Sequence, residues 1–350
     1  MKHILLVFTG GTIGSTATDG TINTSSSAPF KLLQLFEQQY HDHQSVHFDT
    51  LQPIQILSEN LGPAAWKIMI AAIESTQPNK YDGIIVTHGT DTLAYTAAAL
   101  SFYFHASTIP VLLVSSDYPL DNPHGNGLAN FICAAAFIRQ CVALGVFVPY
   151  RNTGQTMQIH QGSRLTCSLQ LTGDFYSVQN NSFMQFDGQH FTSVNTFVTQ
   201  SSNVDKQHQA SLASGDIMPL KPQFSNRILM VKPYPGLDYC HFKLDSVDAV
   251  LHDLYHSGTA CATEQWGKNH SLLEFVKRCG ERGIPIYLAP AIKSENAYQS
   301  TRELIEHGAE MIWNMSIEAA YVKLMLAYGN FSEKKQISGF IDRDIACEHV

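Results

Sequence analysis

The sequence predicts an α/β protein with two domains, each built on a parallel or mixed sheet flanked by helices. Short apolar runs alternate with amphipathic helical patterns, as expected for βαβ units. The chain has 350 residues, more than one hydrophobic core usually holds. A polar stretch poor in aromatic residues separates two such patterns. We therefore expect an N-terminal domain at 1–198, a linker at 199–226 and a smaller C-terminal domain at 227–350.

In the first domain, buried strands are expected at 3–8, 82–87 and 110–114. Each run is apolar throughout and lies between turn signals, which is typical of strands covered on both faces. Val146–Val148 and the alternating stretch 156–172 predict further strands, as a hairpin.

Two segments of the first domain show apolar residues at helical spacing. One helix is predicted after Pro63, a favourable first-turn residue, and a second after Asp91 and Thr92, either of which could cap it. The residues that define these two faces are Trp66, Met69, Ile70 and Ile73 in the first, and Leu93, Ala97, Leu100 and Phe104 in the second.

The second domain repeats the alternation of strand and helix. Strands are expected at 228–232, 247–251 and 284–288, and helices at 270–281 and 316–328.

Composition excludes several classes of protein. The net charge is 22 − 30 = −8 with no basic block, which argues against a nucleic-acid partner. No apolar run reaches the roughly 20 residues that span a bilayer, and the short N-terminal run lacks a signal-peptide cleavage site. Seven cysteines without a C-x-x-C pair indicate neither a disulfide framework nor a zinc site. We therefore expect a cytoplasmic protein without a membrane contact.

A glycine turn follows the first predicted strand directly, in the segment Thr9–Gly14 (TGGTIG). Ligands of open parallel sheets bind outside the carboxyl ends of strands. The glycines allow positive φ, so the Thr12 hydroxyl could project into a pocket beside free N–H groups that hold an oxyanion. The turn matches neither a dinucleotide fingerprint nor a phosphate-binding loop. The alternative is that it only closes a strand.

A second polar turn, Thr87–Thr92 (THGTDT), follows another predicted strand and opens a helix. Hydroxyls and a carboxylate therefore lie beside the N-terminal pole of a helix dipole, which suits a small polar substrate that carries its own carboxylate. The alternative is that Thr90 to Thr92 serve only as helix caps.

The two turns together resemble the paired signature of the bacterial-type L-asparaginases, particularly the cytoplasmic type I branch. The resemblance extends over most of residues 3–328. It includes the serine of Ile56–Asn60 (ILSEN), a helix start at Asn126–Asn130 (NGLAN), a segment similar to G-N-R-x-T at Gly162–Thr166 (GSRLT), and Tyr298–Thr301.

The resemblance implies a threonine amidohydrolase. Thr12 would be the nucleophile that attacks the side-chain amide carbon of L-asparagine, and Thr90 the second catalytic threonine, with Asp91. Asp91 and Ser58 would hold the α-amino and α-carboxylate groups of the substrate. An acyl-enzyme would release ammonia, and water would then release L-aspartate.

Three more residues, Gly11, Glu59 and Gly89, are expected in the substrate site by the same resemblance. It also implies no metal and no organic cofactor. The protein would form a homodimer or homotetramer in which the second domain of one subunit completes the pocket of another.

The sequence departs from the family's pattern at two positions. The family's lysine after the G-N-R-x-T segment is Cys167 here, and Arg164 cannot replace it as a base because guanidinium stays protonated. The tyrosine of the family's flexible loop corresponds to Thr21. The alternative hypothesis is therefore a catalytically impaired relative that binds amino acids. A third hypothesis, the asparaginase-like subunit of a tRNA-dependent amidotransferase, is disfavoured because the first strand begins at residue 3.

The histidines add no strong site. His41, His43 and His47 lie close in sequence, but their loop-like context argues against a metal pair. His88 is expected to line the wall of the pocket rather than act as a base. His252 and His256 are expected to be structural.

Overall fold

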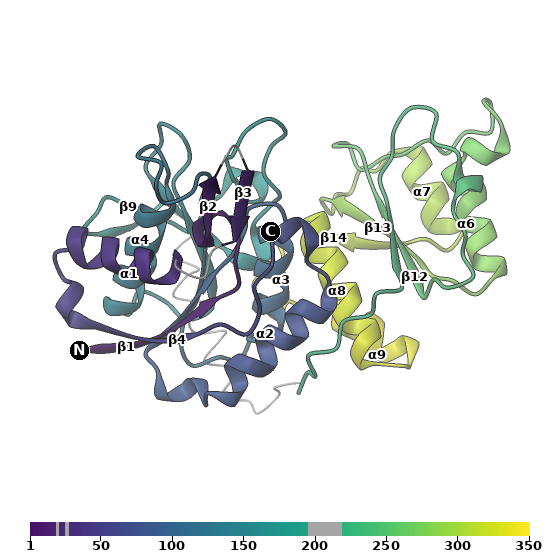
Figure 1. Cartoon of the computed structure of the whole chain (residues 1–350). Helices are drawn as coiled ribbons and strands as arrows, with labels where there is room; N and C mark the ends of the chain where they lie inside the picture. The colour runs from purple at the N-terminus through teal and green to yellow at the C-terminus, as the bar shows by residue number, and fades with distance from the viewer. Residues whose placement is uncertain (19–20, 25–27, 195–218) are drawn as a thin grey trace. The chain divides into compact units, whose positions relative to one another are not determined.

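The structure, a computed structural model, describes residues 1–18, 21–24, 28–194 and 219–350. The chain divides into two compact units, Met1–Pro222 and Gln223–Val350 (Figure 1). Most of the predicted linker lies outside the described residues, so its bounds stay a prediction. Among the described helices, none is both long and apolar enough to cross a membrane.

A mixed sheet forms the centre of the first unit. Within the described residues, eight strands lie in the order β10-β9-β8-β7-β6-β5-β1-β4. The strands from β4 to β7 are parallel, and β8 to β10 continue the sheet in antiparallel fashion. The strands are β1 Lys2–Phe8, β4 Val46–Leu51, β5 Gly83–Thr87, β6 Val111–Val114, β7 Val146–Tyr150, β8 Met157–Gln161, β9 Met184–Phe186 and β10 Phe191–Ser193.

Helices cover this sheet. Leu6 of β1, Ile85 of β5 and Leu112 of β6 belong to one apolar cluster with Phe36 and Phe131, whose rings pack edge to face. These two rings come from α1 and α4, while α2 packs against α3. The buried face of α2 is the one predicted. The helices of this unit are α1 Ala28–Gln39, α2 Pro63–Ser75, α3 Leu93–Tyr103 and α4 Gly127–Arg139.

The three apolar strands predicted in this unit are confirmed as β1, β5 and β6. The prediction for 156–172 was only half right. The hairpin of β7 and β8 forms, but β8 ends at Gln161 and the chain then turns. The Thr166 N–H donates to the Tyr176 carbonyl, and the Leu169 N–H donates to the Asp174 carbonyl. The residues after Gln161 therefore form a loop in place of the rest of the predicted strand. A small hairpin, β2 Ser15–Thr18 and β3 Thr21–Thr24, was not predicted.

The second unit holds a smaller parallel sheet. Its described strands lie in the order β11-β12-β13-β14. Helices α6 and α7 share an apolar cluster with the sheet, α8 contacts β11 and β13, and α9 packs on α8. The elements are β11 Ile228–Val231, β12 Ala249–Asp253, α6 Leu272–Glu281, β13 Ile286–Ala291, α7 Gln299–Glu306, β14 Glu310–Trp313, α8 Ile317–Asn330 and α9 Lys334–Asp342.

Two strands of this unit begin two residues later than predicted. The Val247 N–H donates to the Leu244 carbonyl in a turn, so β12 starts at Ala249 and extends through the polar His252. The Ile284 N–H donates to the Cys279 carbonyl and closes α6, so β13 starts at Ile286. In both places a local turn uses an apolar residue that the pattern assigned to the strand.

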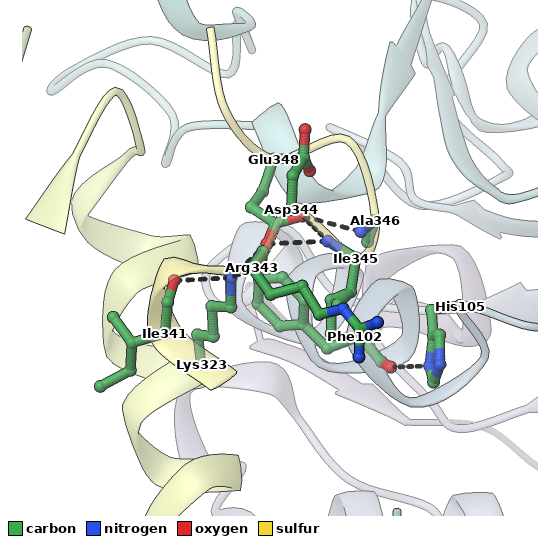
Figure 2. Close-up of polar contacts among 9 residues, drawn as sticks. All are labelled: Phe102, His105, Lys323, Ile341, Arg343, Asp344, Ile345, Ala346 and Glu348. Carbon is green, nitrogen blue, oxygen red and sulfur yellow. Dashed lines mark hydrogen bonds and ion pairs between the residues drawn. The ribbon is translucent and has the colours of Figure 1, made fainter. Parts of the chain in front are cut away.

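A buried ion pair holds the C-terminal segment of the second unit (Figure 2). The Lys323 ammonium on α8 contacts the Glu348 carboxylate, and both side chains are 0% exposed. Lys323 also donates to the carbonyl oxygens of Ile341 at 2.9 Å and Arg343 at 2.5 Å. Glu348 accepts from the Ala346 N–H at 2.7 Å. Burial of the two charges is tolerated because each has several hydrogen-bond partners.

Candidate active site

The turn after β1 is hydrogen-bonded to the end of β5 and to the segment around Ile56, before α2. Thr9 Oγ1 donates to the Thr87 carbonyl at 2.5 Å, and the Thr9 N–H donates to Thr87 Oγ1 at 3.3 Å. Ile56 N–H donates to the Thr9 carbonyl at 2.9 Å, and Gly11 N–H donates to the Ile56 carbonyl at 3.2 Å. The carboxyl ends of the two strands and the segment before α2 therefore form one edge.

Glycine is required twice in this turn. Gly10 and Gly11 have φ of +109° and +78°, which disfavour other residues. A Cβ on Gly11 would also fall on the backbone of His88 and Gly89. The two glycine-flanked turns thus lie in direct contact, and Thr12 and Thr90, both partly exposed, each follow a glycine of that contact.

Ser58 joins the second turn from a short 3-10 helix, Ser58–Asn60. Its Oγ donates to Asp91 Oδ2 at 2.8 Å and accepts from the Asp91 N–H at 3.3 Å. A Cβ on Gly89 would collide with the Ser58 side chain. Ser58 is buried whereas Asp91 is exposed, so the pair supports a carboxylate that faces solvent.

Thr92 stands at the N-cap of α3 but makes no side-chain capping bond. Its hydroxyl instead donates to the Ser58 carbonyl at 3.0 Å. Thr92 is therefore the N-cap residue, one of the two positions predicted, but its side chain makes no capping bond because the hydroxyl bonds to Ser58 instead. The result is a three-point attachment of the Ser58 segment to the second turn.

The structure brings together four of the predicted site residues by contact, namely Gly11, Ser58, Gly89 and Asp91. Glu59 is exposed beside Ser58. The roles predicted for these residues, and for Thr12 and Thr90, stay predictions.

The two positions that depart from the family's pattern lie on separate elements. Thr21 begins β3, a strand beside the 3-10 helix that Thr12 begins. Its side chain lies outside the described residues. Cys167 is a half-buried thiol outside any disulfide; it follows the 3-10 helix Gly162–Arg164, and that helix packs against α3. A Cβ on Gly162 would meet the hydroxyl of Ser101 on α3, which shows how closely the two pack.

Asn126, at the start of α4, connects the helix to neighbouring loops through hydrogen bonds. Asn126 N–H donates to Asp117 Oδ1 at 2.9 Å, and the Asp117 N–H donates to Asn126 Oδ1 at 3.1 Å. The Asn126 side chain also donates to the Arg151 carbonyl at 3.0 Å, and Asn130 bonds to both Ser115 and Arg151. These amides tie the loops after β6 and β7 to α4.

His88 was expected to line the wall of the pocket, but its side chain is buried and bonds to the Gly89 carbonyl instead. His88 is 1% exposed, and burial lowers its pKa to about 4, so it is neutral at physiological pH. His252 is buried between the Asp253 carbonyl and the Tyr239 hydroxyl, as expected of a structural residue. His43 and His47 bond to Tyr40 and Asp49 respectively, and no group that could hold a metal ion occurs among the described residues.

Thr96 and Trp66 were missed as neighbours of the site. Thr96 Oγ1 lies 2.8 Å from His88 Nε2 and accepts from Trp66 Nε1 at 2.9 Å. Both residues look like core positions of helices in the sequence, so no pattern distinguishes them.

The chain is similar to known proteins over most of its length. Residues 3–210 match the family model described as asparaginase, N-terminal. The chain is 26% identical to the D subunit of glutamyl-tRNA(Gln) amidotransferase from Methanococcus maripaludis, over 99% of this chain and 81% of that protein. It is also 26% identical to L-asparaginase of Thermococcus kodakarensis, over 99% and 98%.

A solved structure supports the fold. L-asparaginase I of Vibrio cholerae superposes with a TM-score of 0.77 at 23% identity, covering 100% of this chain and 99% of that one. The family match spans more than half of the chain and includes both threonine turns and Ser58. The chain therefore belongs to the asparaginase family.

Proposed function

We propose that the protein hydrolyses L-asparagine to L-aspartate and ammonia through an acyl-enzyme on Thr12. The observation that carries the proposal is the Ser58–Asp91 pair beside the contact between Gly11 and Gly89. It joins a carboxylate, a hydroxyl and two threonine turns at one edge of the sheet, which suits a small zwitterion with a side-chain amide.

The Ser58–Asp91 pair and the adjacent helix would bind the α-ammonium and α-carboxylate groups of the substrate. Ser58 occupies Asp91 Oδ2, so Oδ1 can accept hydrogen bonds from the α-ammonium group of the substrate. A charge-assisted bond of this kind is roughly twice as strong as a neutral one. The N-terminus of α3, at Leu93, lies two residues beyond and favours the α-carboxylate.

In the proposed reaction Thr12 is the nucleophile and Thr90 is the second catalytic threonine. The Thr12 hydroxyl attacks the amide carbon, its proton passes to the leaving nitrogen, and the carbon–nitrogen bond breaks to give ammonia and an ester. Water then adds to the ester, and the carbon–Oγ bond breaks to release L-aspartate. Backbone N–H groups of the two turns stabilise the oxyanion of both steps.

The assay is ammonia release from L-asparagine, with a thermal-shift titration of L-asparagine and L-aspartate beside it. Thr12→Ala should abolish turnover while the thermal shift by L-aspartate persists. Thr108→Ala, at an exposed threonine, is the matched control and should keep full activity. Ligand-induced stabilisation without turnover in the native protein would instead support the amino-acid-binding alternative suggested by Cys167 and Thr21.

A second candidate is ammonia supply within a glutamyl-tRNA(Gln) amidotransferase, because proteins of that name match 99% of this chain. Ammonia release that occurs only when glutamyl-tRNA(Gln) is added would favour it. Turnover of free L-asparagine without tRNA favours the first candidate, as does the net charge of −8 without a basic cluster.

The assembly and location form part of the same proposal. We expect a homodimer or homotetramer in which the second unit of one subunit completes the site of another. All seven cysteines lie among the described residues as thiols outside any disulfide, which supports a reducing, cytoplasmic location.

A further inference from the structure

Three buried side chains form a hydrogen-bonded row that ends at the carbonyl of the Gly89–Thr90 peptide. Trp66 Nε1 on α2 lies 2.9 Å from Thr96 Oγ1 on α3, and Thr96 Oγ1 lies 2.8 Å from His88 Nε2. His88 Nδ1 lies 2.7 Å from the Gly89 carbonyl oxygen. All three residues are at most 3% exposed, so water does not compete for these hydrogen bonds.

The direction of every hydrogen in this row is determined. The Gly89 carbonyl can only accept, so His88 carries its proton on Nδ1. Trp66 Nε1 can only donate, so Thr96 Oγ1 accepts from it and gives its own hydrogen to His88 Nε2. Burial lowers the pKa of His88 to about 4, although the Gly89 carbonyl and the Asp91 charge raise it. His88 is thus held neutral in one tautomer.

The row fixes the orientation of one peptide plane. In a trans peptide the C=O and N–H groups point in opposite directions. The Gly89 carbonyl is directed at His88, so the Thr90 N–H is directed away from it. Among the described residues no acceptor is bonded to the Thr90 N–H. This N–H belongs to the turn whose glycine contacts Gly11, one residue before Thr12.

We propose that Trp66, Thr96 and His88 are positioning residues that hold the Thr90 N–H toward the oxygen of the substrate amide. The inference rests on the proposed function and adds residues to the same site. The three side chains act through the Gly89 carbonyl and touch no substrate. Their effect is on the charge that develops at the amide oxygen during attack, where a fixed donor contributes most.

The kinetic test compares Thr96→Val with Thr96→Ser. Valine keeps the shape of threonine but removes both hydrogen bonds, whereas serine keeps the hydroxyl. Thr96→Val should lower kcat by about 10- to 100-fold and leave KM within about threefold, because the Ser58–Asp91 pair is intact. Thr96→Ser should retain kcat within a few fold. Thr108→Val, at an exposed threonine, controls for the substitution itself.

A spectroscopic test does not depend on turnover. In protein labelled with ¹⁵N-histidine, the His88 signals are assigned by their loss in His88→Gln. Native His88 should show a protonated Nδ1 and no titration between pH 5.5 and 8. Thr96→Val should keep Nδ1 protonated but shift the Nε2 resonance, because Nε2 loses the hydroxyl that donates to it, and Thr96→Ser should leave both resonances in place.

These outcomes separate the two proposals. A native His88 that is protonated on Nε2, or that titrates near 6.5, overturns the positioning row, as does a Thr96→Val enzyme with unchanged kcat. Absence of turnover on any amide, with the predicted His88 spectrum, overturns the proposed function but leaves the fixed peptide plane intact.

Discussion

Ser58 and Asp91 lie 33 residues apart in sequence and share two hydrogen bonds, one in each direction, of 2.8 Å and 3.3 Å. The first runs from the serine hydroxyl to the carboxylate, and the second from the aspartate N–H to the hydroxyl. Ser58 therefore holds both the backbone and the side chain of Asp91. This relationship gives the exposed carboxylate a fixed place beside the two threonine turns.

Ser58→Ala should weaken substrate binding more than catalysis. It removes a hydrogen bond to a charged group, which contributes about 1.5–3 kcal/mol, so KM should rise roughly 10- to 100-fold. Initial rates of ammonia release across a range of L-asparagine concentrations give KM and kcat. Ser75→Ala, at an exposed helix position, should change neither. An unchanged KM in Ser58→Ala would remove the serine from the substrate site.

Gly10→Ala should destabilise the protein far more than Gly188→Ala. The two glycines have nearly equal φ, +109° and +108°, so both variants carry the same backbone strain. A Cβ at Gly10 would collide with the backbone of Ile56, whereas nothing lies within 4 Å of one at Gly188. Gly188→Ala should therefore cost about 1 kcal/mol of unfolding free energy, and Gly10→Ala about 2 kcal/mol or more beyond that. Chemical denaturation measures both, and equal losses would show that the turn and the Ile56 segment do not pack closely.

Cys167→Lys should increase ammonia release. The substitution restores the residue that the family places after the G-N-R-x-T segment. A positioned proton-transfer group contributes about 10²–10⁴ in rate, so a gain toward the lower end of that range is expected in kcat. Cys261→Lys, at an exposed cysteine, is the control and should have no effect. If Cys167→Lys folds and shows no gain, another group already performs the proton transfer.

The Lys323–Glu348 pair predicts acid sensitivity of the second unit. Burial raises the pKa of Glu348, but the Lys323 ammonium and the hydrogen bonds of the pocket outweigh it and hold the pKa below its ordinary value. A carboxyl whose pKa is lowered by folding stabilises the fold above its unfolded pKa, here about pH 4.5. That stabilisation is lost as the pH falls toward the folded pKa.

Glu348→Gln should therefore lower the unfolding free energy by about 3–5 kcal/mol at pH 7 and flatten its decline below pH 4.5. Glu281→Gln, on the exposed end of α6, should do neither. The pair Lys323→Met with Glu348→Leu should recover part of the loss, since it leaves no unpaired buried charge. Equal stability of Glu348→Gln and the native chain would show that the pair contributes nothing.

The strands and the turn motifs of the site could be predicted because their signals are local. Leu5, Ile85 and Leu112 lie in short apolar runs between turn signals, which are typical of a strand covered on both faces. Contacts between distant segments leave no such signal. The sequence gives no sign that the Thr92 hydroxyl bonds to the Ser58 carbonyl, or that the Trp66 N–H bonds to the Thr96 hydroxyl.

A crystal structure of Thr12→Ala with L-asparagine bound would decide whether the two turns form one substrate site. We expect the α-ammonium and α-carboxylate groups within hydrogen-bond distance of Asp91 and Ser58. We also expect the amide carbon beside residue 12 and the amide oxygen facing the Thr90 N–H. An asparagine bound elsewhere, or with its amide directed away from residues 12 and 90, would contradict the proposed site.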